Sequence, residues 1–216
     1  GYGKPATSAL STNFKPTGLY ASMPNYPARG DIASAKALLD SAGIKPDANG
    51  VRIRAILDLI PYGEDWRRAG EYLKQVLGDI GIKLELRYED VPTWLKRIYH
   101  NYDFVMNVNY FYQLPDPVLG VHRHYGTDQI RKGTHFVNSS RYSNSELDEL
   151  LASGATEANA QKRTQIYKKI QEILARDMPV VNLFELQFLT VYNTKLKGAY
   201  NSALGAYASF SEAYLD

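Results

Sequence analysis

The stretch VRIRAILDLIPYGEDWRRAGEYLKQVLGDIGIKLELRY, residues 51–88, decides the fold class of this chain. Every second residue of 51–59 is apolar, which predicts a β-strand with one buried face. A Pro-Tyr-Gly turn at 61–63 ends the strand, and apolar side chains then recur at helical spacing over 64–80. Alternation returns at 82–88. A strand, a helix and a strand with short joints predict two parallel strands with a right-handed crossover.

Further elements flank this βαβ unit on both sides. Upstream, residues 1–30 are rich in Pro and Gly, and we expect an irregular segment over the surface. Asp31 is placed to cap a helix that Gly43 ends. Downstream, Asp90 caps another helix, and 102–110 alternates as a third strand. The pattern is that of an α/β fold.

The second half of the chain begins with an irregular stretch, 111–141, which is long enough to suggest a functional loop. Helices are predicted at 143–151 and 157–176, and strand-like sequence at 180–186 and 188–192. Helices and strands are therefore expected throughout, in a mixed sheet flanked by helices.

Composition excludes several classes of function. The chain is 44% hydrophobic and 22% charged, and its net charge of +2 is too small to favour nucleic acid or an anionic membrane. It has no cysteine, so disulfides, thiolate metal sites and cysteine nucleophiles are ruled out. No apolar run approaches the roughly 20 residues that span a bilayer. Seventeen tyrosines suit either half-buried strands or a wet binding cleft.

An ordered series of segments resembles the dipeptide- and oligopeptide-binding branch of the extracellular solute-binding proteins, family 5, which feed ABC importers. The segments are GYGKPA (1–6), AKALLDSAG (35–43), EYLKQVLGDIGIKLEL (71–86), TWLKRIYHNYDFVM (93–106), DP (116–117), YSNSELDELL (142–151), QIYKKIQEILARDMPVVNLFE (165–185) and YNTKLKG (192–198). The series covers nearly the whole chain.

This resemblance implies one lobe of a periplasmic binding protein-like fold, type II, that closes on a solute with another lobe. Residues 1–182 would be the second, C-terminal ligand-binding lobe, and 183–216 a strand-rich tail that returns toward the missing first lobe of the same protein. The implied partners are a peptide-like solute and an ABC transporter permease. The implied location is periplasmic, or extracellular and membrane-anchored. Neither a cofactor nor catalysis is implied.

Two positions of the resemblance bear on the ligand. Family members that bind dipeptides carry an arginine before the Pro-Tyr pair and an aspartate three residues before the Asp-Pro pair. This chain has Ile60 and Gln113 there. Burying the charged ends of a zwitterion without partners costs several kcal/mol, on the order of 2–7 for each polar group. We therefore expect a longer or blocked peptide, or another polar solute such as a sugar–phosphate conjugate, rather than a free dipeptide.

The candidate ligand-binding residues follow the first and third strands, because ligands gather at the carboxyl ends of parallel strands. They comprise an apolar residue, three tyrosines, a neutral amide and two charged groups: Ile60, Tyr62, Tyr110, Tyr112, Gln113, Asp116 and Arg123. The alternative is that the aromatic side chains are packed in a core. Arg123 could contact an anionic ligand through its guanidinium.

The most polar cluster, His122-Arg123-His124-Tyr125, leaves a second function open. If this stretch is extended, His122 and His124 face the same way and could join Asp116 in a hydrolytic or metal-dependent enzyme. The sequence has no HExxH, G-x-S-x-G or Walker motif, so the sequence favours a binding protein without a metal. A third possibility is an interaction domain that no longer serves transport.

Overall fold

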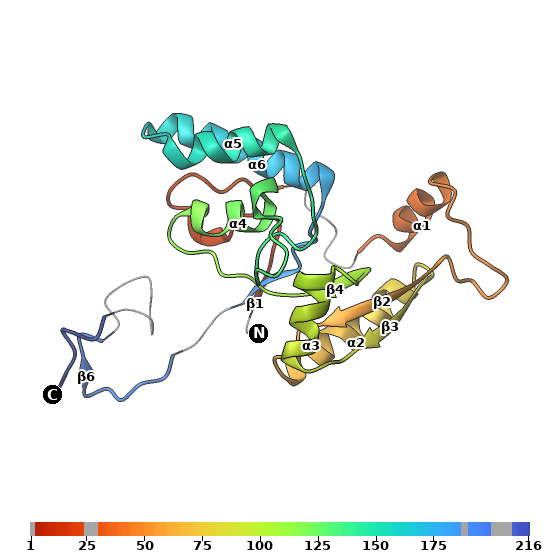
Figure 1. Ribbon diagram of the computed structural model, residues 1–216, viewed down its shortest axis with the longest axis horizontal. Coiled ribbons are helices and arrows are strands. Elements are labelled where there is room, and N and C mark those ends of the chain that lie inside the picture. Colours follow the sequence, from red (N-terminus) through yellow and green to blue (C-terminus); the bar gives the residue numbers. More distant parts are fainter. Residues whose placement is uncertain (1–2, 24–29, 187–189, 200–208) are drawn as a thin grey trace. The chain divides into compact units, whose positions relative to one another are not determined.

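The computed structural model describes residues 3–23, 30–186, 190–199 and 209–216 (Figure 1). The chain divides into two compact units, between which it passes repeatedly. Unit 1 comprises Gly1–Met23, Tyr112–Gly126 and Ser143–Asp216, and unit 2 comprises Pro24–Phe111 and Thr127–Tyr142.

Unit 2 is built on a three-stranded sheet in the order β3-β2-β4. Strand β2 (Ile53–Leu59) is parallel both to β3 (Ile82–Arg87) and to β4 (Met106–Val108). Helix α2 (Glu64–Gly78) forms the crossover from β2 to β3. The βαβ prediction is confirmed, although β4 is shorter than the strand expected at 102–110.

The alternating side chains of β2 divide between two cores. Leu57 and Leu59 pack with Leu84 and Val108 on the face that α2 covers. Gly70 of α2 lies directly against Leu59, so an added Cβ would collide with that side chain. The absence of a side chain at Gly70 therefore lets α2 approach the sheet closely.

The second core of unit 2 lies against a short helical segment. Asp90 caps α3 (Val91–Leu95) by accepting a hydrogen bond from the Thr93 N–H at 2.8 Å, as expected. The chain continues as a π-helix, η2 (Lys96–Asn101), and the left-handed Tyr102, with φ of 52°, ends it. The buried side chains of this core are Ile60, Trp94, Ile98, Tyr99 and Val137.

Helix α1 (Ile32–Ser41) has the predicted bounds but not the predicted packing. The Asp31 carboxylate accepts from the Ser34 N–H, and Gly43 has a positive φ of 78° just beyond the helix. No residue of α1 is buried, and Leu38 is 70% exposed. The apolar periodicity therefore predicted the helix correctly, but the apolar face of this helix is exposed to solvent in the structure.

Unit 1 centres on two helices, α5 (Ser145–Thr156) and α6 (Ala160–Asp177), which pack against each other. Strand β1 (Gly3–Pro5) pairs antiparallel with β5 (Phe184–Leu186). The shorter elements of this unit are η1 (Thr12–Phe14), η3 (Pro117–Leu119), α4 (Val121–Tyr125), β6 (Leu196–Lys197) and β7 (Tyr214–Leu215), and η4 (Thr127–Gln129) belongs to unit 2.

The N-terminal segment of unit 1 departs from the expected surface course. Leu10, Phe14 and Leu19 are buried. The Gln171 side chain of α6 is fully buried and joins this segment through both of its amide atoms. Its Oε1 accepts from Ser8 Oγ at 2.7 Å and from the Ala21 N–H at 2.9 Å, and its Nε2 donates to the Leu19 carbonyl at 2.8 Å. The segment is therefore part of the core.

Several other expectations are refined. The α/β class is confirmed, but the sheet of unit 2 is entirely parallel, and antiparallel pairing is found in the separate ribbons β1–β5 and β6–β7. The stretch 111–141 contains short helices rather than continuous loop. Part of the strand expected at 188–192 lies outside the described residues, and 190–192 form no strand. The division at 182/183 stays a prediction. Among the described residues, no helix is long and apolar enough to cross a membrane.

Candidate functional site

Three aromatic side chains meet where β2 and β4 end, and we call them the aromatic platform: Tyr62, Trp66 and Tyr110. Trp66 stacks on Tyr110 with ring centroids 5.4 Å apart and planes inclined by 19°. Tyr62 meets Tyr110 edge-on, with centroids 5.9 Å apart. Such geometries are the favoured ones for aromatic pairs. Tyr62 is 42% exposed, so the platform presents an aromatic surface at the rim of unit 2.

The local sequence explains why these rings converge. The chain turns sharply after β2, where the Tyr62 N–H donates to the Ile60 carbonyl at 2.9 Å. Gly63, with φ of 115°, then begins α2 in a backbone conformation that side chains disfavour. Trp66 falls in the first turn of α2, and Tyr110 follows β4, which runs parallel to β2. Parallel strands bring their carboxyl ends to the same edge.

The platform rests on the core that contains α3 and η2. Trp66 and Tyr110 pack against the buried cluster that includes Ile60, Trp94 and Tyr99. The Tyr99 hydroxyl accepts from Asn109 Nδ2 at 2.7 Å, which ties η2 to the residue before Tyr110. The platform is thus supported from beneath by packed side chains.

Ile60 does not share the exposure of its neighbour Tyr62. Its side chain is 1% exposed and packs with Trp94 and Ile98. The residue expected to face the solute is therefore a core residue in the structure, because side chains at 58 and 60 point to the sheet face that α3 and η2 cover.

The remaining candidates lie in unit 1, and two of them have well-defined partners there. Gln113 Oε1 accepts from the Ser11 N–H at 2.7 Å, and Gln113 Nε2 donates to the Ala9 carbonyl. These bonds fasten the N-terminal segment to the stretch after Tyr112. The amide expected to bind a solute is therefore engaged within unit 1, whereas Tyr112 is 48% exposed.

Asp116 is held by an arginine that the sequence reading missed. Arg163 Nη2 of α6 donates to both Asp116 oxygens, at 2.8 and 2.9 Å, and the Val118 N–H donates to Oδ1 at 2.9 Å. Burial alone raises the pKa of Asp116, but these hydrogen bonds outweigh it and lower the pKa below its usual value. The carboxylate thus caps η3 and anchors it to α6.

The histidine cluster does not have the extended conformation that a metal site required. His122 and His124 lie on helix α4, where residues two apart point in different directions, so the condition on which the metal-site alternative depended is not met. His124 is buried, and burial together with the charge of Arg123 lowers its pKa to about 3. Among the described residues, no group of three or more His, Asp or Glu could hold a metal ion. Arg123 itself is exposed.

The candidates therefore separate into two sets. Tyr62 and Tyr110 converge with Trp66 in unit 2, whereas Tyr112, Gln113, Asp116 and Arg123 belong to unit 1. Trp66 was absent from the sequence-derived set. Its position, four residues after Tyr62 and one turn into a helix that starts at the edge of the sheet, is the signal that could have identified it.

A family model matches more than half of the chain. It describes the bacterial extracellular solute-binding proteins, family 5 middle, and covers residues 1–131. Among curated proteins, the peptide transport periplasmic protein SapA of Haemophilus influenzae is 24% identical over 68% of this chain and 26% of its own length. Di/tripeptide-binding protein 3 of Pseudomonas aeruginosa is 22% identical over 82% of this chain and 32% of its own length. The chain spans about a third or less of these relatives.

Solved structures show the same fold. The dipeptide-binding protein of Pseudoalteromonas sp. SM9913, in complex with Met-Leu, aligns with all of this chain and 41% of its own, with a TM-score of 0.77 and 20% identity. HbpA2 of Haemophilus parasuis aligns with the same coverage, a TM-score of 0.75 and 21% identity. The chain therefore has a periplasmic binding protein-like fold.

Proposed function

The chain belongs to family 5 of the bacterial extracellular solute-binding proteins, and we propose that it supplies one wall of a cleft that binds a peptide or peptide-like polar solute. The other wall comes from a further lobe of the same protein. Closure of the two lobes on the solute produces the form that docks on the permease of an ABC importer. The protein then acts outside the cytoplasmic membrane, in the periplasm or anchored to the membrane surface.

The observation that carries this proposal is the aromatic platform. Three rings meet at the carboxyl edge of a parallel sheet, where solutes of α/β proteins collect. Tyr62 combines an apolar face with a hydroxyl, so it can stack on an apolar group and also hydrogen-bond to a polar one. A peptide side chain or a sugar ring has this mixed character.

The absence of charged side chains at positions 60 and 113 favours a ligand other than a free dipeptide. The residue before Pro61 is an apolar core residue, and the Gln113 amide is neutral and engaged with Ala9 and Ser11. Neither offers a charge to the terminus of a zwitterion. Tyr112 and Arg123 are the exposed candidates of unit 1, and Arg123 would suit a carboxylate or phosphate on a longer or conjugated solute.

The hydrolytic alternative loses its basis. It needed His122, His124 and Asp116 to act together, but the two histidines are separated by the turn of α4 and the Asp116 carboxylate is paired with Arg163. A binding protein that leaves its solute unchanged is the function we retain.

The identity of the solute can be obtained by native mass spectrometry of the full-length protein purified from its source. We expect a co-purifying small molecule with peptide bonds or sugar hydroxyls. Turnover of that molecule by the purified protein, or stoichiometric metal in its place, would contradict the proposal.

Removal of a platform ring gives the residue-level prediction. Tyr62→Ala in the full-length protein should weaken binding of the co-purified solute about five-fold, because one aromatic contact contributes about 1 kcal/mol. Isothermal titration calorimetry measures the change. Tyr72→Ala is the matched control, since Tyr72 is a 65% exposed tyrosine of α2 outside the platform. Equal affinities for the two variants would remove the platform from the site.

A further inference from the structure

A buried carboxylate lies on β2 close to the edge that carries the platform. Asp58 is 1% exposed, and neither of its oxygens has a hydrogen-bond partner. It stands in register with Arg87 on β3 and Asn107 on β4. A buried charge without hydrogen bonds is costly, and proteins seldom retain one without a function.

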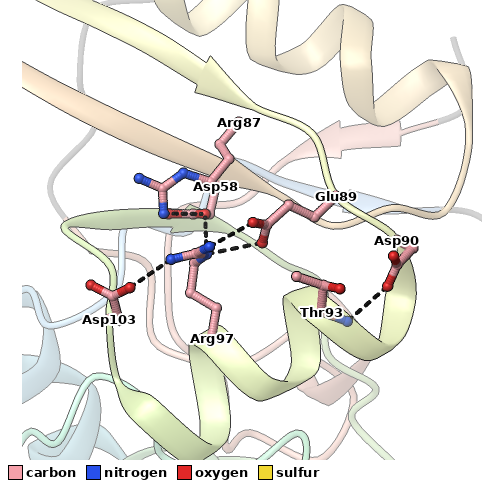
Figure 2. A network of polar contacts seen from close by, with 7 residues as sticks. All are labelled: Asp58, Arg87, Glu89, Asp90, Thr93, Arg97 and Asp103. Atoms are coloured by element: carbon pink, nitrogen blue, oxygen red, sulfur yellow. Dashed lines mark hydrogen bonds and ion pairs between the residues drawn. The ribbon is translucent and has the colours of Figure 1, made fainter.

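Figure 2 shows Arg97 of η2 joined to Asp58, Glu89 and Asp103, whereas Arg87 of β3 is joined to Asp58 alone. Arg97 makes its short bonds elsewhere: Nε and Nη2 donate to Glu89 at 2.9 and 2.6 Å, and Nη1 donates to Asp103 at 2.6 Å. Asp58 Oδ1 has only longer ion-pair contacts, 3.6 Å from Arg97 Nε and 3.4 Å from Arg87 Nη1.

The cluster holds one negative charge too many. Asp58, Glu89 and Asp103 face two guanidiniums, those of Arg87 and Arg97. Glu89 is secured by Arg97, whose hydrogen bonds lower the pKa of that carboxyl. Burial raises the pKa of Asp58, the two arginines oppose this, and Glu89 and Asp103 reinforce it. The excess charge is therefore borne by the carboxylate that is buried most deeply.

We propose that Asp58 is a proton-uptake site that controls how firmly α3 and η2 are held on the sheet of unit 2. When it is ionised, Asp58 attracts Arg97 toward β2. Uptake of one proton cancels the excess charge and removes that attraction, while Glu89 and Asp103 keep their bonds to Arg97. Because burial raises the pKa of Asp58 by more than the arginines lower it, the cost of the buried charge exceeds this attraction, and proton uptake favours the state in which α3 and η2 lie closely on the sheet.

The consequence reaches the aromatic platform through shared packing. Trp94 of α3 and Tyr99 of η2 belong to the same core as Ile60, on which Trp66 and Tyr110 rest. More firmly held α3 and η2 would give the platform a more rigid support at acidic pH, and ionisation of Asp58 would loosen that support as the pH rises. This consequence for solute binding rests on the proposed function, whereas proton uptake by Asp58 does not.

Carboxyl-selective NMR tests the uptake without any ligand. The full-length protein, labelled with ¹³C at the aspartate carboxyl carbons, is titrated with acid, and Asp58→Asn identifies the resonance of Asp58. We expect Asp58 to titrate at higher pH than the capping residues Asp31 and Asp90, whose pKa values are lowered by hydrogen bonds to Ser34 and Thr93. Titration of Asp58 together with those residues would overturn the proposal.

Fluorine NMR tests the coupling to α3. In protein labelled with 5-fluorotryptophan, Trp94→Phe identifies the resonance of Trp94. That resonance should shift with the same midpoint as the Asp58 carboxyl, and the shift should vanish in Asp58→Asn. If the Trp94 resonance did not change as Asp58 titrates, protonation of Asp58 would have no effect on α3, and the proposal would be wrong.

One acidic neighbour gives a test that leaves Asp58 intact. Asp103→Asn removes a repelling charge next to Arg97 and should move the Asp58 midpoint to lower pH. Asp128→Asn is the control, because Asp128 is another exposed acid paired with an arginine, Arg131 at 3.7 Å. We expect no shift there. Equal midpoints in both variants and the parent would also overturn the proposal.

Discussion

Unit 1 and unit 2 are each stabilised internally, by different kinds of contact. In unit 2, consecutive segments of sequence pack apolar faces against each other, as α2 does on β2 and β3. In unit 1, segments far apart in the chain are joined by polar side chains, as Gln171 joins the N-terminal segment to α6 and Glu185 accepts from the Thr12 N–H at 2.8 Å. The first kind of packing is local and tolerant, whereas the second depends on individual side chains.

Replacing Gln171 should destabilise unit 1, and this is the largest effect on stability that we predict. Gln171→Leu removes a hydrogen-bond partner from the buried Ser8 hydroxyl and Leu19 carbonyl and from the half-buried Ala21 N–H, at a cost of about 4 kcal/mol in the free energy of unfolding. Urea denaturation measures the loss. Hydrogen exchange should quicken in residues 8–21 and α6 before it does in β2 and β3.

Gln165→Leu serves as the control, because Gln165 is an exposed residue of the same helix. Its stability should match that of the parent within about 0.5 kcal/mol. If the two variants were equally stable, unit 1 would not depend on its polar contacts.

The charged cluster gives the corresponding test of unit 2, with a somewhat smaller effect. Arg97→Met leaves three carboxylates with Arg87 alone, and the free energy of unfolding should fall by about 3 kcal/mol. Asp58→Asn instead balances the charges and should stay within about 1 kcal/mol of the parent at neutral pH. Unfolding can be followed by tryptophan fluorescence, since Trp66 and Trp94 both belong to unit 2. The reverse order of stabilities would refute the charge count.

The smallest effect that we predict is the contribution of the Asp116–Arg163 pair to the pH dependence of stability in unit 1. The pKa of Asp116 is lowered, so its contribution to stability is present above the usual aspartate pKa and is lost as the pH falls through the lowered value. Arg163→Met should reduce this acid-side loss by less than about 1 kcal/mol, because the pair is partly exposed. Melting temperatures at pH 7 and pH 3 measure it, with the exposed Lys162→Met as control. An unchanged difference would mean that the pair contributes nothing.

Asp58 contributes with the opposite sign in the same range. Because its pKa is raised, the folded state binds its proton first, and this stabilisation is lost as the pH rises through the raised value. The two aspartates therefore partly compensate each other during acidification.

The sequence predicted what depends on local periodicity. The strands and helix of 51–88, the Asp31 and Asp90 caps and the glycine that ends α1 all follow from neighbouring residues. The parallel pairing of β2 with β3 was predicted, and Tyr62 and Tyr110 were expected at the same edge because they follow the first and third strands, which are parallel in the structure.

What the sequence did not predict depends on partners far along the chain. Asp58 falls between apolar neighbours in an alternating strand, and nothing nearby indicates that Arg97 reaches it. Arg163 meets Asp116 across 47 positions, and Gln113 meets Ser11 across 102. Helix α4 was missed because His122 to Tyr125 contains polar and aromatic residues without a helical apolar period.

The pairing of β1 with β5 has a consequence for how the molecule is assembled during synthesis. Unit 2 is complete once residue 142 has emerged, whereas β1 must wait for residues 184–186 before it has a partner. Strand β1 is thus made about 180 residues before the strand with which it pairs. A chain that stops short of residue 186 would lack the partner of β1 and would leave that strand edge open to aggregation.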